Sequence, residues 1–143
     1  MRFLLIPLLL LGCGVLHKAP GVYTEVEEFK IYTDEYLVYK KKYLGIDKVN
    51  YAIDIVFSQY IDFPTVGQCY RTDDQTAPRE ISVSQEYWKN KTDVTKLELI
   101  MHEMGHCDLN YEHQEDVSGI MNPYLRNKIL TDTVIEAFFL EAR

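Results

Sequence analysis

Three of the four histidines of the chain lie within a short segment that ends at His113. The first two, His102 and His106, follow the spacing HExxH together with Glu103. On a helix, residues four positions apart point to nearly the same side, so both imidazoles can reach one metal ion. Glu103 is then placed to act on a water molecule at that ion. The spacing therefore predicts a metal site with an adjacent carboxylate base.

The helix that must position these residues is expected over residues 94–109, with Thr92 or Asp93 as its N-cap. Apolar residues lie on the side opposite the imidazoles and would anchor the helix in the core, namely Leu97, Ile100, Met101 and Met104. By chance, HExxH occurs in roughly one chain of this length in a few hundred. The clustering of three histidines favours a metal site over unliganded surface or core histidines.

The segment from residue 102 to residue 123 resembles the metzincin zinc peptidases. In that family a third histidine after a tight bend completes the zinc site, and a turn containing methionine lies beneath the metal. Here His113 and Met121, the latter within the run SGIMNP, match these two features. The resemblance covers about residues 80–124. It implies one Zn²⁺ per chain, with His102, His106 and His113 as ligands.

The third ligand departs from the usual metzincin spacing HExxHxxGxxH, which would place Leu109 at the glycine and Glu112 at the last ligand. Two interpretations follow: Glu112 is the ligand, or the helix runs one residue longer and bends at Asn110, which makes His113 the ligand. Asn tolerates the left-handed conformation that such a bend requires, whereas Leu109 would be strained there by roughly 1 to 2 kcal/mol. We therefore expect His113, and Asp108 is expected to point away from the metal.

The resemblance also implies roles for other residues. Met121 would shape the floor of the site without binding the metal, although a methionine in a loop is often only core packing. Tyr124 resembles the tyrosine with which some metzincins stabilise the oxyanion, although theirs usually lies one residue closer to the methionine; a packing role is the alternative. The implied fold is a small, twisted, mainly parallel sheet with an antiparallel edge strand at the cleft, and residues 80–84 would be that edge.

The activity that these residues imply is hydrolysis of peptide bonds in a peptide or protein substrate. The metal would activate water, and Glu103 would take its proton as general base. Two other functions fit a zinc site of this kind: a zinc-stabilised binding module of the cell envelope without catalysis, and a zinc hydrolase of non-peptide substrates. A structural zinc site is closed and needs no carboxylate beside an open position, so Glu103 favours an enzyme.

The remaining pattern predicts one α+β domain over residues 22–143. Thr24 and Glu27 form a capping box for a helix that ends at Gly45, and a last helix over residues 131–143 begins at Thr131 or Asp132. Three segments have strand patterns, namely residues 51–60, which read as a central strand, 66–70 and 80–84. The run of lysines at 40–42 is interpreted as a solvated helix end.

The N-terminus has the pattern of a bacterial lipoprotein signal. Met1 and Arg2 precede an apolar stretch over residues 3–11, which is too short to span a bilayer, and Gly12 and Cys13 follow. We therefore expect a signal peptide over residues 1–12 and a lipid-anchored Cys13 with a tether over residues 13–21. The chain would be exported to the bacterial cell envelope, at the outer membrane or cell surface. An ordinary signal peptide with an incidental cysteine is the alternative.

Two further cysteines, Cys69 and Cys107, could pair in an exported protein or remain as two small buried thiols.

The chain has 22 acidic and 15 Lys and Arg residues, for a formal charge of −7. Binding to a phosphate backbone needs clustered cations, so this charge argues against a nucleic-acid partner.

Overall fold

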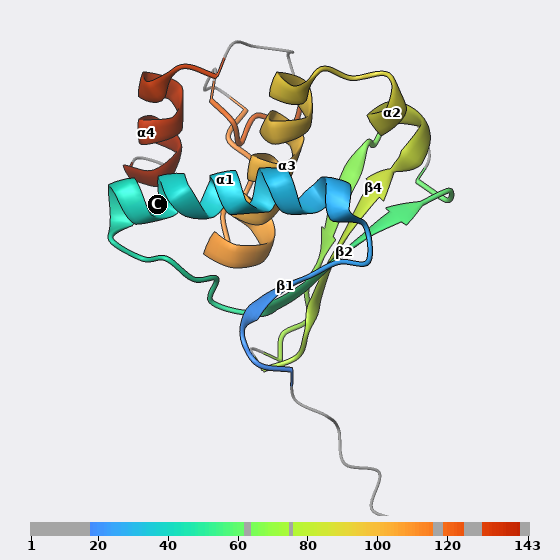
Figure 1. The fold of residues 1–143 in the computed structure, drawn as a ribbon, viewed down its shortest axis with the longest axis horizontal. Helices are drawn as coiled ribbons and strands as arrows, with labels where there is room; N and C mark the ends of the chain where they lie inside the picture. Colours follow the sequence, from blue (N-terminus) through green and yellow to red (C-terminus); the bar gives the residue numbers. More distant parts are fainter. Residues whose placement is uncertain (1–17, 62–63, 75, 116–118, 125–129, 141–143) are drawn as a thin grey trace, which may run out of the picture.

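The structure is a computed structural model that describes residues 18–61, 64–74, 76–115, 119–124 and 130–140. It is an α+β fold with a four-stranded mixed sheet, which confirms the expected class. The elements are β1 (Gly21–Tyr23), α1 (Glu27–Leu44), β2 (Ala52–Ser58), β3 (Gly67–Tyr70), β4 (Arg79–Ser84), α2 (Gln85–Lys89), α3 (Asp93–Leu109) and α4 (Asp132–Leu140). Figure 1 shows α1 crossing α3, with the sheet to one side of both helices.

The strand order in the sheet is β1-β2-β4-β3. β2 is parallel to both β1 and β4, and β3 pairs antiparallel with β4. The sheet therefore has an antiparallel edge strand, but that strand is β3. The expectation that residues 80–84 form the edge is wrong, because β4 has partners on both sides. The side chains of Ile81 and Val83 in β4 are buried in the hydrophobic core of the protein.

The first strand and the first helix also differ from the expectation. β1 begins at Gly21, so the sheet includes the last residue assigned to the tether. The N-cap of α1 is Val26, without a side-chain hydrogen bond, so the predicted capping box at Thr24 is wrong. The hydroxyl of Thr24 instead accepts a hydrogen bond from the Val26 N–H before the helix begins. Gly45 ends α1 in the left-handed conformation, as expected.

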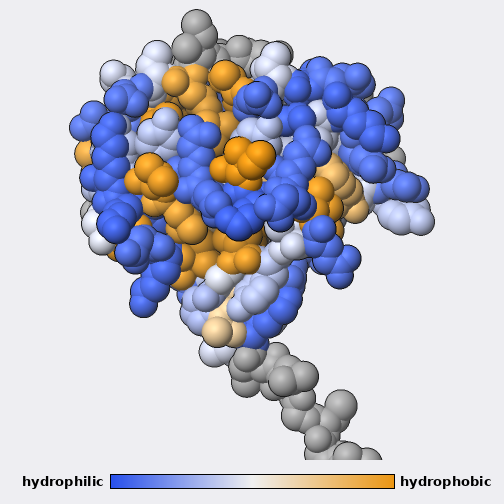
Figure 2. All heavy atoms as spheres, viewed as in Figure 1, coloured by the Kyte–Doolittle hydropathy of each residue, from blue (hydrophilic) through white to orange (hydrophobic). Residues whose placement is uncertain are grey.

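The sequence pattern did not predict α2. This helix begins directly after β4, and Ser84, the last residue of β4, is its N-cap. Trp88 of α2 is fully buried and contacts the ring of Phe29 from α1 at 4.9 Å between centroids. In α4 the hydroxyl of Thr131 accepts a hydrogen bond from the Val134 N–H, in agreement with the predicted cap. The face of the molecule that carries α1 is mostly hydrophilic with interspersed apolar residues (Figure 2).

A buried ion pair joins α1 to α3. Lys40 and Asp108 are both fully buried, with Nζ and Oδ2 2.6 Å apart. The Tyr36 hydroxyl donates to the same carboxylate at 2.6 Å, and the backbone N–H of Asn50 donates to its other oxygen. The interpretation of residues 40–42 as a solvated helix end is therefore wrong for Lys40, because a buried carboxylate of α3 lies within its reach. Removing one partner of a fully buried pair typically costs about 3 to 5 kcal/mol.

Among the described residues, no helix is both long enough and apolar enough to cross a bilayer.

Candidate metal centre and cleft

Three imidazoles meet at one point beside α3. The Nε2 atom of His102 lies 3.2 Å from that of His113 and 3.3 Å from that of His106. One ligand atom from each of the three residues lies within 4.8 Å of the others, so they are close enough to hold a metal ion. His102 is buried, His106 is half-buried and His113 is exposed, so the group opens toward solvent on the side of His113.

The hydrogen bonds of His102 and His106 leave the Nε2 lone pairs of these two rings available to a cation. The Nδ1 atoms of His102 and His106 lie 2.7 Å and 2.6 Å from the carbonyl oxygens of Ile120 and Tyr111. A carbonyl only accepts, so each Nδ1 must carry the proton and each Nε2 presents a lone pair. Burial lowers the pKa of His102 to about 4, and it also lowers the pKa of His106. Both rings are therefore neutral near pH 7, as metal ligands must be.

A left-handed turn at Asn110 brings the third histidine to this point. Asn110 ends α3 with φ of 58°, as the sequence predicted. Its side-chain oxygen accepts a hydrogen bond at 2.6 Å from Arg79, which also donates to the Cys107 carbonyl at 2.7 Å. The guanidinium of the buried Arg79 lies 3.3 Å from the centre of the Tyr51 ring. Arg79 on β4 thus holds the turn that precedes His113.

Two alternative ligands lie elsewhere. The side chain of Glu112 is 77% exposed, lies outside the three-histidine group and pairs with Arg71. Asp108 is buried against Lys40 of α1, away from the imidazoles. Arg71 also donates to the His106 carbonyl at 3.3 Å, so it connects the end of β3 to the last turns of α3 and to the loop that carries His113.

Glu103 lies in the same cleft, between α3 and β3. It is buried, and burial raises the pKa of its carboxyl group to about 8, opposed by a hydrogen bond from the Cys69 backbone. This carboxyl therefore favours its neutral form unless a positive charge lies nearby. A cation held by the three imidazoles would supply such a charge.

Met121 packs beneath the helix that carries the histidines. It is buried, and a Cβ atom on Gly105 would lie 2.5 Å from its Sδ atom. The absence of a side chain at Gly105 thus allows Met121 to approach α3 closely. The neighbouring Ile120 supplies the carbonyl that orients His102. Tyr124 is 73% exposed and lies at the border of the cleft.

The cleft beside the imidazoles has a volume of about 630 Å³. One wall is the segment before and along β3, with Val66, Gly67 and Cys69, and Pro123 and Tyr124 also line the cleft. Leu99 and Tyr87 provide an apolar part of the lining. A cleft of this size can take a short stretch of polypeptide or a small molecule.

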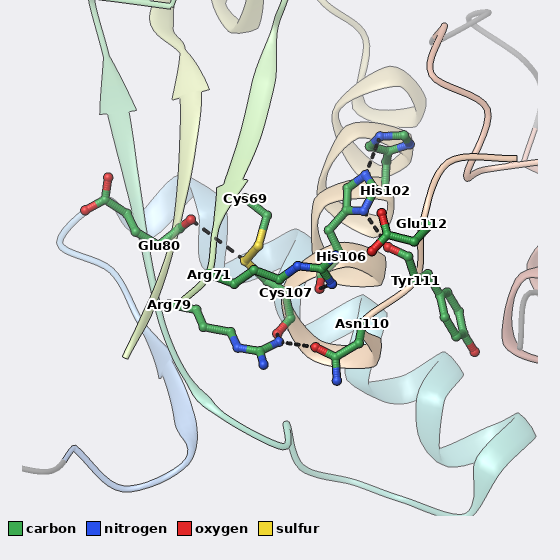
Figure 3. Close-up of a disulfide and its surroundings, with 10 residues drawn as sticks. All are labelled: Cys69, Arg71, Arg79, Glu80, His102, His106, Cys107, Asn110, Tyr111 and Glu112. Carbon is green, nitrogen blue, oxygen red and sulfur yellow. Dashed lines mark hydrogen bonds and ion pairs between the residues drawn. A yellow bond between two sulfur atoms is a disulfide. The ribbon is translucent and has the colours of Figure 1, made fainter. Parts of the chain in front are cut away.

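A disulfide joins Cys69 of β3 to Cys107 of α3, with Cα atoms 5.7 Å apart (Figure 3). Cys107 directly follows His106, one of the three clustered histidines, in the sequence. The cleft wall and the helix are therefore covalently connected. Pairing was one of two alternatives from the sequence, and the structure has the pair.

Sequence reasoning missed Arg71, Arg79 and Gly67 as neighbours of the site. A glycine within a strand pattern often marks a close approach of another group, which was an available signal for Gly67. No local pattern distinguishes the two arginines. Cys13, the predicted lipid anchor, lies outside the described residues.

Comparisons of the chain with protein-family models, with curated proteins and with solved structures find no match.

Proposed function

We propose that this chain is a zinc-dependent endopeptidase of the metzincin type. One observation carries the proposal: three converging Nε2 atoms and the buried side chain of Glu103 border one cleft, and a wall of this cleft is β3, an edge strand of the sheet formed by the described residues. The expected metzincin-like domain and the roles of Met121 and Tyr124 are part of the same proposal. The position of Met121 beneath Gly105 supports its role as the floor of the site.

The spacing of the imidazoles supports zinc as the metal. Zinc–nitrogen bonds of about 2.0 to 2.1 Å in a tetrahedral site place the nitrogens about 3.3 to 3.4 Å apart. The two Nε2 separations at His102 are 3.2 and 3.3 Å. Three imidazole ligands also leave a fourth position open, which is typical of catalytic rather than structural zinc.

When bound, zinc would polarise the scissile carbonyl and lower the pKa of a water molecule toward about 7. Glu103 accepts the proton of the attacking water as general base and returns it to the leaving amine. His102 and His106 are held in the tautomer that presents Nε2 by the carbonyls of Ile120 and Tyr111. Tyr124 is the candidate donor to the oxyanion, from the border of the cleft.

The edge position of β3 among the described strands supports a peptide as the substrate. The Val66 carbonyl accepts a hydrogen bond from Ser84, so this position faces β4. Pairing groups alternate along an antiparallel strand, so the backbone groups of Gly67 and Cys69 face the edge away from β4. An extended peptide can add to this edge by backbone hydrogen bonds, beside the imidazoles. This favours peptide hydrolysis over a non-peptide substrate, and Glu103 favours catalysis over binding alone.

The direct test is cleavage of a peptide library by residues 18–143, with and without a chelator. Cleavage that stops on chelation and returns on addition of one equivalent of zinc is the expected result. If no peptide is cleaved although zinc binds, a binding module is the better description. Hydrolysis of non-peptide esters or amides alone would point to the other alternative.

We also propose that the chain is exported and lipid-anchored through Cys13. This proposal is supported by the positively charged Arg2, the apolar residues 3–11 and the pair Gly12 and Cys13. The disulfide is also typical of a protein in an oxidising compartment. Cys13→Ser is expected to abolish labelling by radioactive palmitate and to release the protein from the membrane fraction. Labelling and fractionation equal to wild type would contradict the anchor.

A further inference from the structure

Gly67 of β3 lies directly against the carboxylate of Glu103. A Cβ atom at this position would come 2.7 Å from Oε1 and 3.1 Å from Cδ of Glu103, and 2.8 Å from Cδ1 of Leu99. Separations below 3.0 Å require one of the groups to move. Leu99 is fully buried, whereas Glu103 borders the cleft, so its carboxylate can shift into that space. Any side chain at residue 67 would therefore displace the carboxylate, Leu99 or the strand.

The helix presents one row of residues to this strand. Leu99, Glu103 and Cys107 are spaced four apart in α3, so they lie on the same side of the helix. On β3, Gly67 and Cys69 are two apart and share one face of the strand. Gly67 lies against Leu99 and Glu103, and Cys69 is bonded to Cys107. The row Leu99, Glu103 and Cys107 on α3 therefore packs along the row Gly67 and Cys69 on β3.

The disulfide holds β3 against α3 one helical turn beyond Glu103, where it joins Cys69 to Cys107. The Glu103 carboxylate can lie this close to β3 because residue 67 has no side chain. Figure 3 shows the disulfide crossing from β3 to α3 on the side of the helix next to His106.

We infer that Gly67 is a positioning residue for the general base: because it has no side chain, it leaves the space in which the Glu103 carboxylate lies, in the cleft that also contains the three imidazoles. The inference rests on the proposed function for its catalytic meaning. A shift of a reacting group by about 1 Å can lower a rate up to about 100-fold. Gly67→Ala therefore has a specific expected effect, which is a lower kcat with KM and zinc affinity close to wild type.

A double-mutant cycle tests the contact without relying on activity. The melting temperature of the chelator-treated protein is measured for wild type, Gly67→Ala, Glu103→Ala and the double variant. Because Glu103→Ala removes the atoms that the new Cβ would meet, Gly67→Ala is expected to lower the melting temperature clearly less in that background than in wild type. An equal loss in both backgrounds would assign the contact to Leu99 and would overturn the inference.

Kinetics and a matched control complete the experiment. Gly119→Ala adds a Cβ with nothing within 4 Å, so it should leave the melting temperature unchanged and controls for the added methyl group itself. A kcat of Gly67→Ala equal to wild type would overturn the inference even if the melting temperatures are coupled. If Gly67→Ala alone does not fold, the same four proteins are compared in a Leu99→Ala background, which removes the other close contact of residue 67.

The proposed function fails separately from this inference. A wild-type protein that binds zinc but cleaves no peptide would contradict the function. In that case the coupling of the melting temperatures alone decides whether Gly67 places Glu103.

Discussion

Glu103→Gln is expected to abolish peptide hydrolysis while the protein still binds one zinc ion. The amide keeps the size of the carboxylate, so the close contacts with Gly67 and Leu99 remain, but it cannot accept a proton from water. General-base catalysis contributes on the order of 100- to 10,000-fold, so kcat should fall by that amount. Zinc content by mass spectrometry under native conditions and kcat with the best library peptide are the two measurements.

His102→Ala is the matched control for this experiment. His102 precedes Glu103 and belongs to the three-histidine group, so its removal should lower both activity and zinc content. The two variants thus separate the loss of the base from the loss of the metal. If Glu103→Gln cleaved peptide at the wild-type rate, the assignment of Glu103 as general base would be wrong.

His113→Ala is expected to weaken zinc binding far more than Glu112→Ala, although the two residues are adjacent. The Nε2 atom of His113 lies 3.2 Å from that of His102, whereas the Glu112 side chain is 77% exposed and paired with Arg71. Loss of a ligand should exceed the roughly 10- to 100-fold effect of residues outside the ligand set. Loss of an exposed ion pair should change affinity by only a few-fold.

Competition with a chelating dye measures both affinities at the same pH. The adjacent positions make each variant the control for the other, since any general effect on the loop is shared. A severe loss in Glu112→Ala with near-normal binding in His113→Ala would make Glu112 the third ligand.

Local sequence determined the centre of the candidate site. The spacing of His102 and His106 places two imidazoles on one side of any helix, and the capping signals at Thr92 place that helix correctly. Asn110 was predicted as the left-handed residue because few other side chains tolerate that conformation, and the turn indeed lies there. These features depend on near neighbours in the chain, so the sequence alone was sufficient to predict them.

The tertiary structure decided which strand borders the cleft. Residues 80–84 alternate apolar and polar side chains, which is equally typical of an edge strand and of an interior strand with one polar face. Only the pairing of β4 with both β2 and β3 separates the two cases. The wall of the cleft is therefore β3, whose short pattern carries no sign of its position in the sheet.

The tertiary structure also decided the environment of individual charged and small residues. Lys40 is part of a lysine run that is exposed at residues 41 and 42, yet it is buried because Asp108 lies opposite it on another helix. Gly67 meets Glu103, and Cys69 meets Cys107, across similar gaps in the sequence. Such contacts join segments far apart in the chain, and their formation depends on how helices and sheet pack. No local pattern of residues contains that information.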